Sequence, residues 1–112
     1  MVSPYIPDRG DIVWIDFSPQ VGHEQAGYRP ALVVSPISYN LPSGLMLACP
    51  ITSTIKDYPF EVRLRLKDTE GVILADQVKN LDWRSRPVRF DQIASHEVID
   101  LVQRLIASLV MG

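Results

Sequence analysis

The chain has 112 residues, of which 46% are hydrophobic and 21% are charged, and its formal net charge is −2. A chain of this length and composition can bury one hydrophobic core, so we expect a single globular domain over residues 1–112 and exclude general disorder. The slightly negative charge argues against indiscriminate nucleic-acid binding, because affinity for phosphate depends on neutralisation by Lys and Arg.

The sequence shows no pattern typical of secretion or membrane insertion. Pro4, Pro7 and Asp8 interrupt the N-terminus, so a signal peptide is not expected, and no run of about 18 apolar residues occurs. The single cysteine, Cys49, lies in an apolar run and has no partner for an internal disulfide, which is typical of a buried thiol in a reducing compartment. We therefore expect a cytoplasmic protein without a membrane partner.

The first half of the chain predicts three strands. Residues 10–17 are rich in Ile, Val, Trp and Phe and form the first expected strand. Residues 18–28 have the Pro and Gly content of an exposed loop, which is where chemistry often occurs. The short apolar runs 31–34 and 45–51 predict central strands, and residues 36–44 are expected to connect them.

The second half begins with the clearest strand signal in the sequence. Residues 60–66 alternate strictly between apolar and charged or polar side chains, as one face of a sheet requires. Residues 72–78 and 88–90 are shorter strand candidates. Several short strands separated by Gly, Pro and Asp indicate a mainly β fold with helices, built around a small barrel.

The last segment changes to a helical period. Ser95 is the expected N-cap, and the carboxylate of Glu97 complements the helix dipole. The apolar residues expected to face the core are Val98, Leu101, Val102, Leu105 and Leu109. Further apolar residues widen the arc to about 180°, beyond the roughly 100° that covers one core: Ile99, Ile106 and Val110. We expect an amphipathic helix that closes the barrel and has apolar surface left for a partner subunit.

Metal and cofactor chemistry are not indicated by the sequence. Zinc sites need clusters of Cys and His, whereas this chain has Cys49 and two widely separated histidines, His23 and His96. Asp11 and Asp16 flank the first strand, where solvated acids are common. No phosphate-binding glycine loop or nucleophile motif occurs, so we expect no metal and no cofactor.

The most unusual segment is residues 22–30, which ends where a buried strand begins. Pro30 restricts Arg29 to extended geometry, so the guanidinium projects from a defined point at the base of the loop and is suited to binding phosphate. An equally good alternative is that Arg29 pairs with Glu24 or stabilises the loop. Spacing alone leaves both interpretations open.

Residues 10–17, residues 22–31 and the later stretch 75–78 together resemble the MazF/PemK family of bacterial toxins. The resemblance extends to residues 58–62 and to the closing helix. It implies a homodimer of SH3-like, CcdB/PemK-type barrels that acts as a sequence-specific, metal-independent endoribonuclease on single-stranded RNA such as mRNA. Such an enzyme leaves a 2′,3′-cyclic phosphate and a 5′-hydroxyl, inhibits translation and growth, and is neutralised by a cognate antitoxin.

The resemblance also implies catalytic residues. Arg29 matches the arginine of the family's loop motif, and Thr52 matches the threonine that ends the third strand. Since the ribose 2′-hydroxyl supplies the nucleophile, the enzyme has to position the RNA, transfer protons and stabilise charge. We expect electrostatic stabilisation from Arg29, because its pKa above about 12 makes proton release costly. Glu24 is the candidate proton acceptor, and its alternative role is to order the loop.

The residues expected to contact RNA are aromatic, polar or basic and lie near the loop or in the segments that the resemblance covers: Phe17, His23, Gln25, Tyr28, Lys56, Asp76, Gln77, Lys79 and Arg86. Aromatic rings stack on single-stranded bases, and polar groups bond to base edges. Each has a structural alternative. Phe17 and Tyr28 can belong to the core, Asp76 and Gln77 can solvate a strand edge, and charged residues often form only a solvated face.

Two other functions stay open at the level of sequence. A CcdB-like toxin on the same fold would bind gyrase without catalysis, and it would not need the loop over residues 24–30. A barrel that binds RNA without cutting it fits poorly with a net charge of −2. The expected protein partner is an antitoxin with an acidic, initially disordered segment, and DNA would be contacted only indirectly, through the antitoxin complex.

Overall fold

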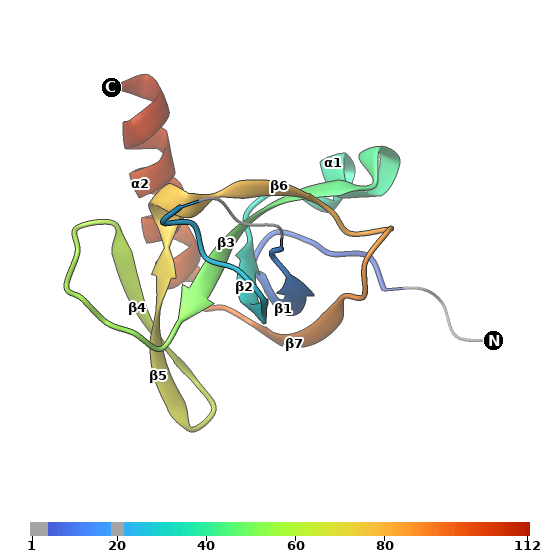
Figure 1. The fold of residues 1–112 in the computed structure, drawn as a ribbon. Helices are drawn as coiled ribbons and strands as arrows, with labels where there is room; N and C mark the ends of the chain where they lie inside the picture. The colour runs from blue at the N-terminus through green and yellow to red at the C-terminus, as the bar shows by residue number, and fades with distance from the viewer. Residues whose placement is uncertain (1–4, 19–21) are drawn as a thin grey trace.

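The computed structural model describes residues 5–18 and 22–112 (Figure 1). Its elements follow one another as β1 (Asp11–Asp16), β2 (Tyr28–Val33), α1 (Ile37–Ser43), β3 (Leu45–Thr52), β4 (Glu61–Leu66), β5 (Thr69–Leu74), the 3-10 turn η1 (Ala75–Gln77), β6 (Lys79–Asp82), β7 (Arg89–Ile93) and α2 (His96–Met111). The fold is therefore mainly β with helices, as the sequence predicts.

The strands form one strongly bent antiparallel sheet in the order β4-β5-β3-β2-β1-β7, and β6 pairs with β3 beside this path. The long strand β3 causes the bend. Its first part pairs with β2 and β6, whereas Ile51 and Thr52 at its end pair with β5. The result is a half-barrel, and the expected barrel-type fold with a C-terminal helix is confirmed.

The sheet encloses two hydrophobic clusters. The cluster beneath α2 contains the buried residues Ile12, Leu32, Val34, Cys49, Ile51, Val62, Ile73, Ala75 and Val102. The second cluster contains Val13, Ile15, Phe17, Ala31, Val33, Met46, Ala48, Leu81 and Trp83. Cys49 is fully buried, and burial raises the pKa of its thiol to about 12, so it is chemically inert in the folded protein.

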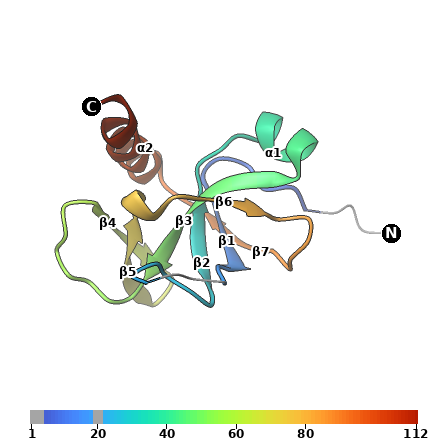
Figure 2. The same cartoon turned by 45° about the horizontal axis from the view of Figure 1, so that its top comes forward.

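Helix α2 begins as predicted, because the Ser95 hydroxyl accepts a hydrogen bond from the main-chain N–H of Val98 at 3.3 Å. In both orientations the helix lies near β4 and η1 (Figure 1, Figure 2). Its core-facing side is rotated from the predicted one. Leu101 and Leu109 are half exposed, whereas Ile99 and Ile106 pack against the core. Across the described part of the chain, no helix is long and apolar enough to span a membrane.

The structure differs from the prediction most clearly in three segments. Residues 36–44 are more than a connection, because they contain α1, which holds Pro42 in its last turn and ends at Gly44 with φ of 72°. The expected strand 72–78 stops at Leu74, and η1 follows it. Strand β6 was not predicted, because Leu81 is its only buried residue and no alternation is visible.

Candidate active site

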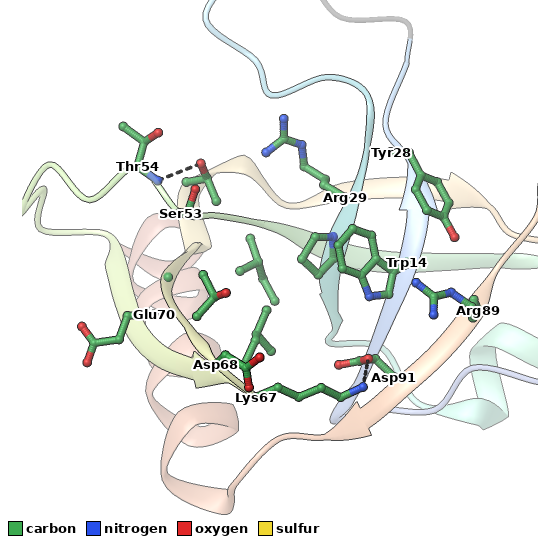
Figure 3. A pocket seen from close by; sticks show the side chains of 16 residues that line it. Trp14, Tyr28, Arg29, Ser53, Thr54, Lys67, Asp68, Glu70, Arg89 and Asp91 are labelled. Carbon is green, nitrogen blue, oxygen red and sulfur yellow. Dashed lines mark hydrogen bonds and ion pairs between the residues drawn. The ribbon is translucent and has the colours of Figure 1, made fainter.

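An open pocket of about 700 Å³ lies where the end of β3 meets the face formed by β1, β2 and β7. The turn between β4 and β5 forms its opposite wall (Figure 3). The two residues expected to be catalytic, Arg29 and Thr52, both line it, as does Tyr28. The structure thus brings together residues from separate strands that sequence reasoning had connected only by resemblance.

Arg29 lies near the start of β2, where it pairs with Ile15 of β1. Its Nε donates a hydrogen bond to the carbonyl of Ala26 at 2.8 Å. Gly27 makes this loop geometry possible with a φ of 81°. One of the five guanidinium N–H groups is thereby used to fix the side chain, and the four on the terminal nitrogens can serve a ligand.

Thr52 ends β3 and pairs with Val72 of β5. Its Oγ1 accepts a hydrogen bond from the main-chain N–H of Thr54 at 3.2 Å. Because a hydroxyl can donate while it accepts, Thr52 can still donate its own proton to an oxygen in the pocket. A Cβ at the neighbouring Gly71 would lie 2.9 Å from the Thr52 carbonyl oxygen, so a glycine is required where the two strands approach.

An aromatic pair lines the pocket beside Arg29. The rings of Trp14 and Tyr28 have centroids 5.6 Å apart and are tilted by 31°. Tyr28 is 52% exposed, so its ring is available to stack on a base, and its contact with RNA stays a prediction. Trp14 was missed as a site residue. Its alternation with the buried Val13 and Ile15 places it on the outer face of β1 and could have indicated it.

The side of the pocket near β7 carries an ion pair. The Nζ of Lys67 lies 3.3 Å from a carboxylate oxygen of Asp91, whose side chain is 9% exposed. A hydrogen bond from the side chain of Gln92 lowers the pKa of Asp91, and the nearby Lys67 lowers it further. Two other acids line the pocket: Asp68 in the turn between β4 and β5, and Glu70 in β5. Over residues 5–18 and 22–112, no three His, Cys, Asp or Glu side chains are grouped so that they could hold a metal ion.

Four predicted site residues meet outside this pocket, where the loop 22–27 contacts the segment after β5. The ammonium of Lys79 lies 3.2 Å from a carboxylate oxygen of Glu24. The main-chain N–H of Gln25 donates to the side-chain oxygen of Gln77 at 2.9 Å. None of the four lines the pocket that contains Arg29. Glu24 does not line this pocket, and its role as proton acceptor stays a prediction.

Asp76 lies on η1 with an exposed side chain. Its negative charge raises the pKa of the Tyr58 hydroxyl, and a hydrogen bond between the two side chains adds to this effect. Tyr58 belongs to the segment between β3 and β4. Asp76 therefore lies close to Tyr58, a proximity that the sequence did not indicate for either residue.

Of the remaining predicted RNA contacts, Phe17 has to be corrected. Its side chain is 1% exposed within the second core cluster, so its ring cannot stack on a base. Arg86 donates to the carbonyls of Asp16 at 2.7 Å and Asp82 at 3.1 Å, and its contact with RNA stays a prediction. His23 and Lys56 are exposed and lie outside the pocket.

Comparison with known proteins identifies the family. Residues 8–110 match the family model described as PemK-like, MazF-like toxin of type II toxin-antitoxin system. The chain is 46% identical over 110 residues to the endoribonuclease toxin MazF of Escherichia coli (strain K12), covering 98% of this chain and 99% of that protein.

Two solved structures from Deinococcus radiodurans are also similar. A crystal structure of MazF matches with a TM-score of 0.91 and 50% identity, over 97% of this chain and 100% of that one. A MazE-MazF crystal structure matches with a TM-score of 0.84 and 48% identity, over 96% and 98% of the two chains. Both similarities extend over nearly the whole fold.

Proposed function

We propose how this chain acts from the premise that it belongs to the family of PemK-like, MazF-like toxins of type II toxin-antitoxin systems and is an endoribonuclease toxin. In this proposal it cleaves single-stranded RNA at short specific sequences without a metal. The observation that carries the proposal is the presence of Arg29 and Thr52 in one open pocket, beside the exposed ring of Tyr28. The pocket combines charge stabilisation with a surface for stacking on bases.

The proposed reaction uses the ribose 2′-hydroxyl as its nucleophile. The 2′-oxygen attacks the adjacent phosphorus and loses its proton, and the bond to the 5′-oxygen of the next nucleotide breaks. The leaving oxygen takes up a proton. The products are a 2′,3′-cyclic phosphate and a 5′-hydroxyl, so no water enters this step. Because the substrate supplies the nucleophile, the protein has to hold the reacting groups in line and stabilise negative charge on the phosphoryl oxygens.

Arg29 supplies the charge. With Nε bonded to Ala26, its terminal nitrogens can donate to two phosphoryl oxygens as their charge increases. Thr52 adds a neutral hydroxyl donor from the end of β3. Both side chains are held by main-chain bonds before RNA binds, so the reaction need not reorganise them.

Glu24 acts on the loop in this scheme. Its ion pair with Lys79 holds the loop 22–27 against the segment that follows η1, and the bond between Gln25 and Gln77 adds a second connection. We therefore assign Glu24 to positioning. The side-chain amide nitrogen of Gln77 can still donate to a base edge while its oxygen accepts from Gln25.

The proposed assembly is a homodimer in the cytoplasm that is neutralised by a cognate antitoxin. Solved relatives include MazE-MazF complexes, which supports an antitoxin partner for this chain. An acidic segment would complement Arg29, and such a segment would become ordered on binding. The exposed apolar residues at the end of α2, among them Leu109 and Val110, offer surface to a second copy of the chain.

The proposal is tested with two forms of one RNA. Purified protein is incubated with a long single-stranded RNA and with the same RNA annealed to its complement, and cut sites are mapped. We expect cleavage of the single strand at a recurring short sequence and protection of the duplex. An intact single strand, or equal cleavage of both forms, would contradict the proposal. Variants of pocket residues are compared with Arg104→Gln as a control, because Arg104 lies on α2 and pairs with Asp100 at 2.9 Å.

A further inference from the structure

A second arginine, Arg89 of β7, lines the pocket, and no role follows for it from the reaction described above. Its guanidinium carbon lies 5.4 Å from the centroid of the Trp14 ring. Trp14 pairs with Arg89 on one side and with Pro30 of β2 on the other. Directly paired residues share a face, so this row crosses three strands on the wall of the pocket.

The two arginines lie on either side of the aromatic pair. In Figure 3, Arg29 and Arg89 are seen on opposite sides of Trp14, while Asp68 and Glu70 lie across the pocket. Lys67 of the turn and Asp91 of β7 pair with each other across the pocket, which leaves Arg29 and Arg89 beside the aromatic pair on the first wall and Asp68 and Glu70 on the facing wall. A polyanion that enters the pocket is attracted to the first wall and repelled by the second. The phosphates of a bound strand would follow the line from Arg29 to Arg89.

Arg89 is not held in the ion pair that Asp91 forms. Asp91 lies two residues further along the chain and interacts with Arg89 through its charge, but it forms an ion pair with Lys67 at 3.3 Å and accepts a hydrogen bond from Gln92 at 2.9 Å. Arg89 itself is exposed. A guanidinium that lies over a ring keeps its N–H donors in its own plane, where they can bind phosphate.

We propose that Arg89 is a second phosphate-binding residue of this site, which holds a phosphate next to the scissile one while Trp14 and Tyr28 stack on the intervening base. This inference rests on the proposed RNA-cleaving function. Arg89 is a positioning residue here, because the reacting phosphate is assigned to Arg29. Its effect therefore falls on substrate binding, whereas the chemical step depends on Arg29 and Thr52.

The test uses Arg89→Gln, with Arg104→Gln as a control of equal charge change on α2. Steady-state kinetics on an oligonucleotide that contains a mapped cut site separate KM from kcat. Binding is measured with the same oligonucleotide carrying a 2′-O-methyl group at the cut, so that no cleavage occurs, over a range of salt concentrations. We expect KM and the dissociation constant to rise about tenfold in Arg89→Gln, with kcat changed less than about threefold.

The salt dependence identifies the contact as one to phosphate. Loss of one phosphate contact on single-stranded RNA reduces the slope of log affinity against log salt by about 0.7. Arg89→Lys keeps the charge but loses the planar stack, so it should retain the wild-type slope and bind several-fold more weakly. Arg104→Gln should match the wild type in KM, kcat, dissociation constant and salt slope.

Two failures are distinguishable. If the wild-type protein neither binds nor cleaves RNA, the proposed function fails before any variant is compared. If the wild type cleaves RNA and Arg89→Gln has the wild-type KM and salt slope, only the role of Arg89 is overturned. If Arg89→Gln does not fold, the test rests on the affinity of Arg89→Lys for the oligonucleotide. Wild-type affinity in Arg89→Lys would contradict the inference.

Discussion

The ammonium of Lys79 lies 3.2 Å from the carboxylate of Glu24 and connects the loop before β2 to the start of β6. Arg29 leaves this loop at its other end and is bonded back to it through Ala26. The ion pair thus helps to fix the segment from which the proposed catalytic arginine projects. Glu24 therefore helps to position the loop that carries Arg29, and experiment can distinguish this role from proton transfer.

Glu24→Gln and Lys79→Gln should have similar and modest effects. A partly exposed ion pair contributes about 1 kcal/mol or less, which corresponds to a loss of less than about tenfold in kcat/KM. The double variant should lose no more kcat/KM than the more affected single variant, because each substitution breaks the same ion pair. If Glu24 were the general base, Glu24→Gln would lower kcat by about 10²- to 10⁴-fold while Lys79→Gln stayed active.

Arg29→Ala should lower kcat by at least about 10²- to 10³-fold without unfolding the protein. The substitution removes the proposed charge stabilisation, whereas Arg29 is only partly buried at the edge of β2. Arg29→Lys should recover little activity, since an ammonium cannot bind two oxygens with paired donors. Single-turnover cleavage and thermal unfolding of the same samples check both points. Near wild-type turnover by Arg29→Ala would remove this residue from the mechanism.

Thr52→Val tests the hydroxyl with little change in shape. Valine suits the strand position and cannot donate to a phosphoryl oxygen or accept from Thr54. We expect a loss in kcat of about 10²-fold, and we expect Thr52→Ser to restore most of it. Equal loss in the Val and Ser variants would show that the methyl group matters more than the hydroxyl.

Substitutions at two leucines of α2 should distinguish effects on folding from effects on dimerisation. Leu105 packs against the core, whereas Leu109 is 51% exposed. Leu105→Asp should therefore reduce the free energy of unfolding by at least about 2 kcal/mol. Leu109→Asp should leave the unfolding midpoint of the monomer unchanged and weaken dimerisation, as measured by sedimentation. A stable Leu105→Asp protein would contradict the packing described for α2.

The elements with a clear apolar period were predictable from the sequence. Strands β1 and β4 and helix α2 have such a period, and Ser95 caps α2 as expected. Helix α1 was not predictable, because its only buried residue is Asn40, whose side-chain nitrogen donates to the carbonyls of Pro7 and Ser35. A polar residue that is buried through distant hydrogen bonds produces no hydrophobic pattern.

The candidate site was predictable only in part. Pro30 and the loop composition indicated Arg29, and the resemblance indicated Thr52. Trp14 and Arg89 meet because β1 pairs with β7, and this contact between distant parts of the chain has no local signal. The burial of Phe17 likewise follows from how the sheet bends over its second core cluster. Such contacts depend on tertiary structure, which residue type alone does not specify.

The most direct test of the central proposal is to incubate the purified protein with single-stranded RNA in excess EDTA and to determine the chemistry of both fragment ends. We predict efficient cleavage that Arg29→Ala abolishes, with a 2′,3′-cyclic phosphate on one fragment and a 5′-hydroxyl on the other. Cleavage that requires added metal, or fragments that carry a 5′-phosphate, would contradict it.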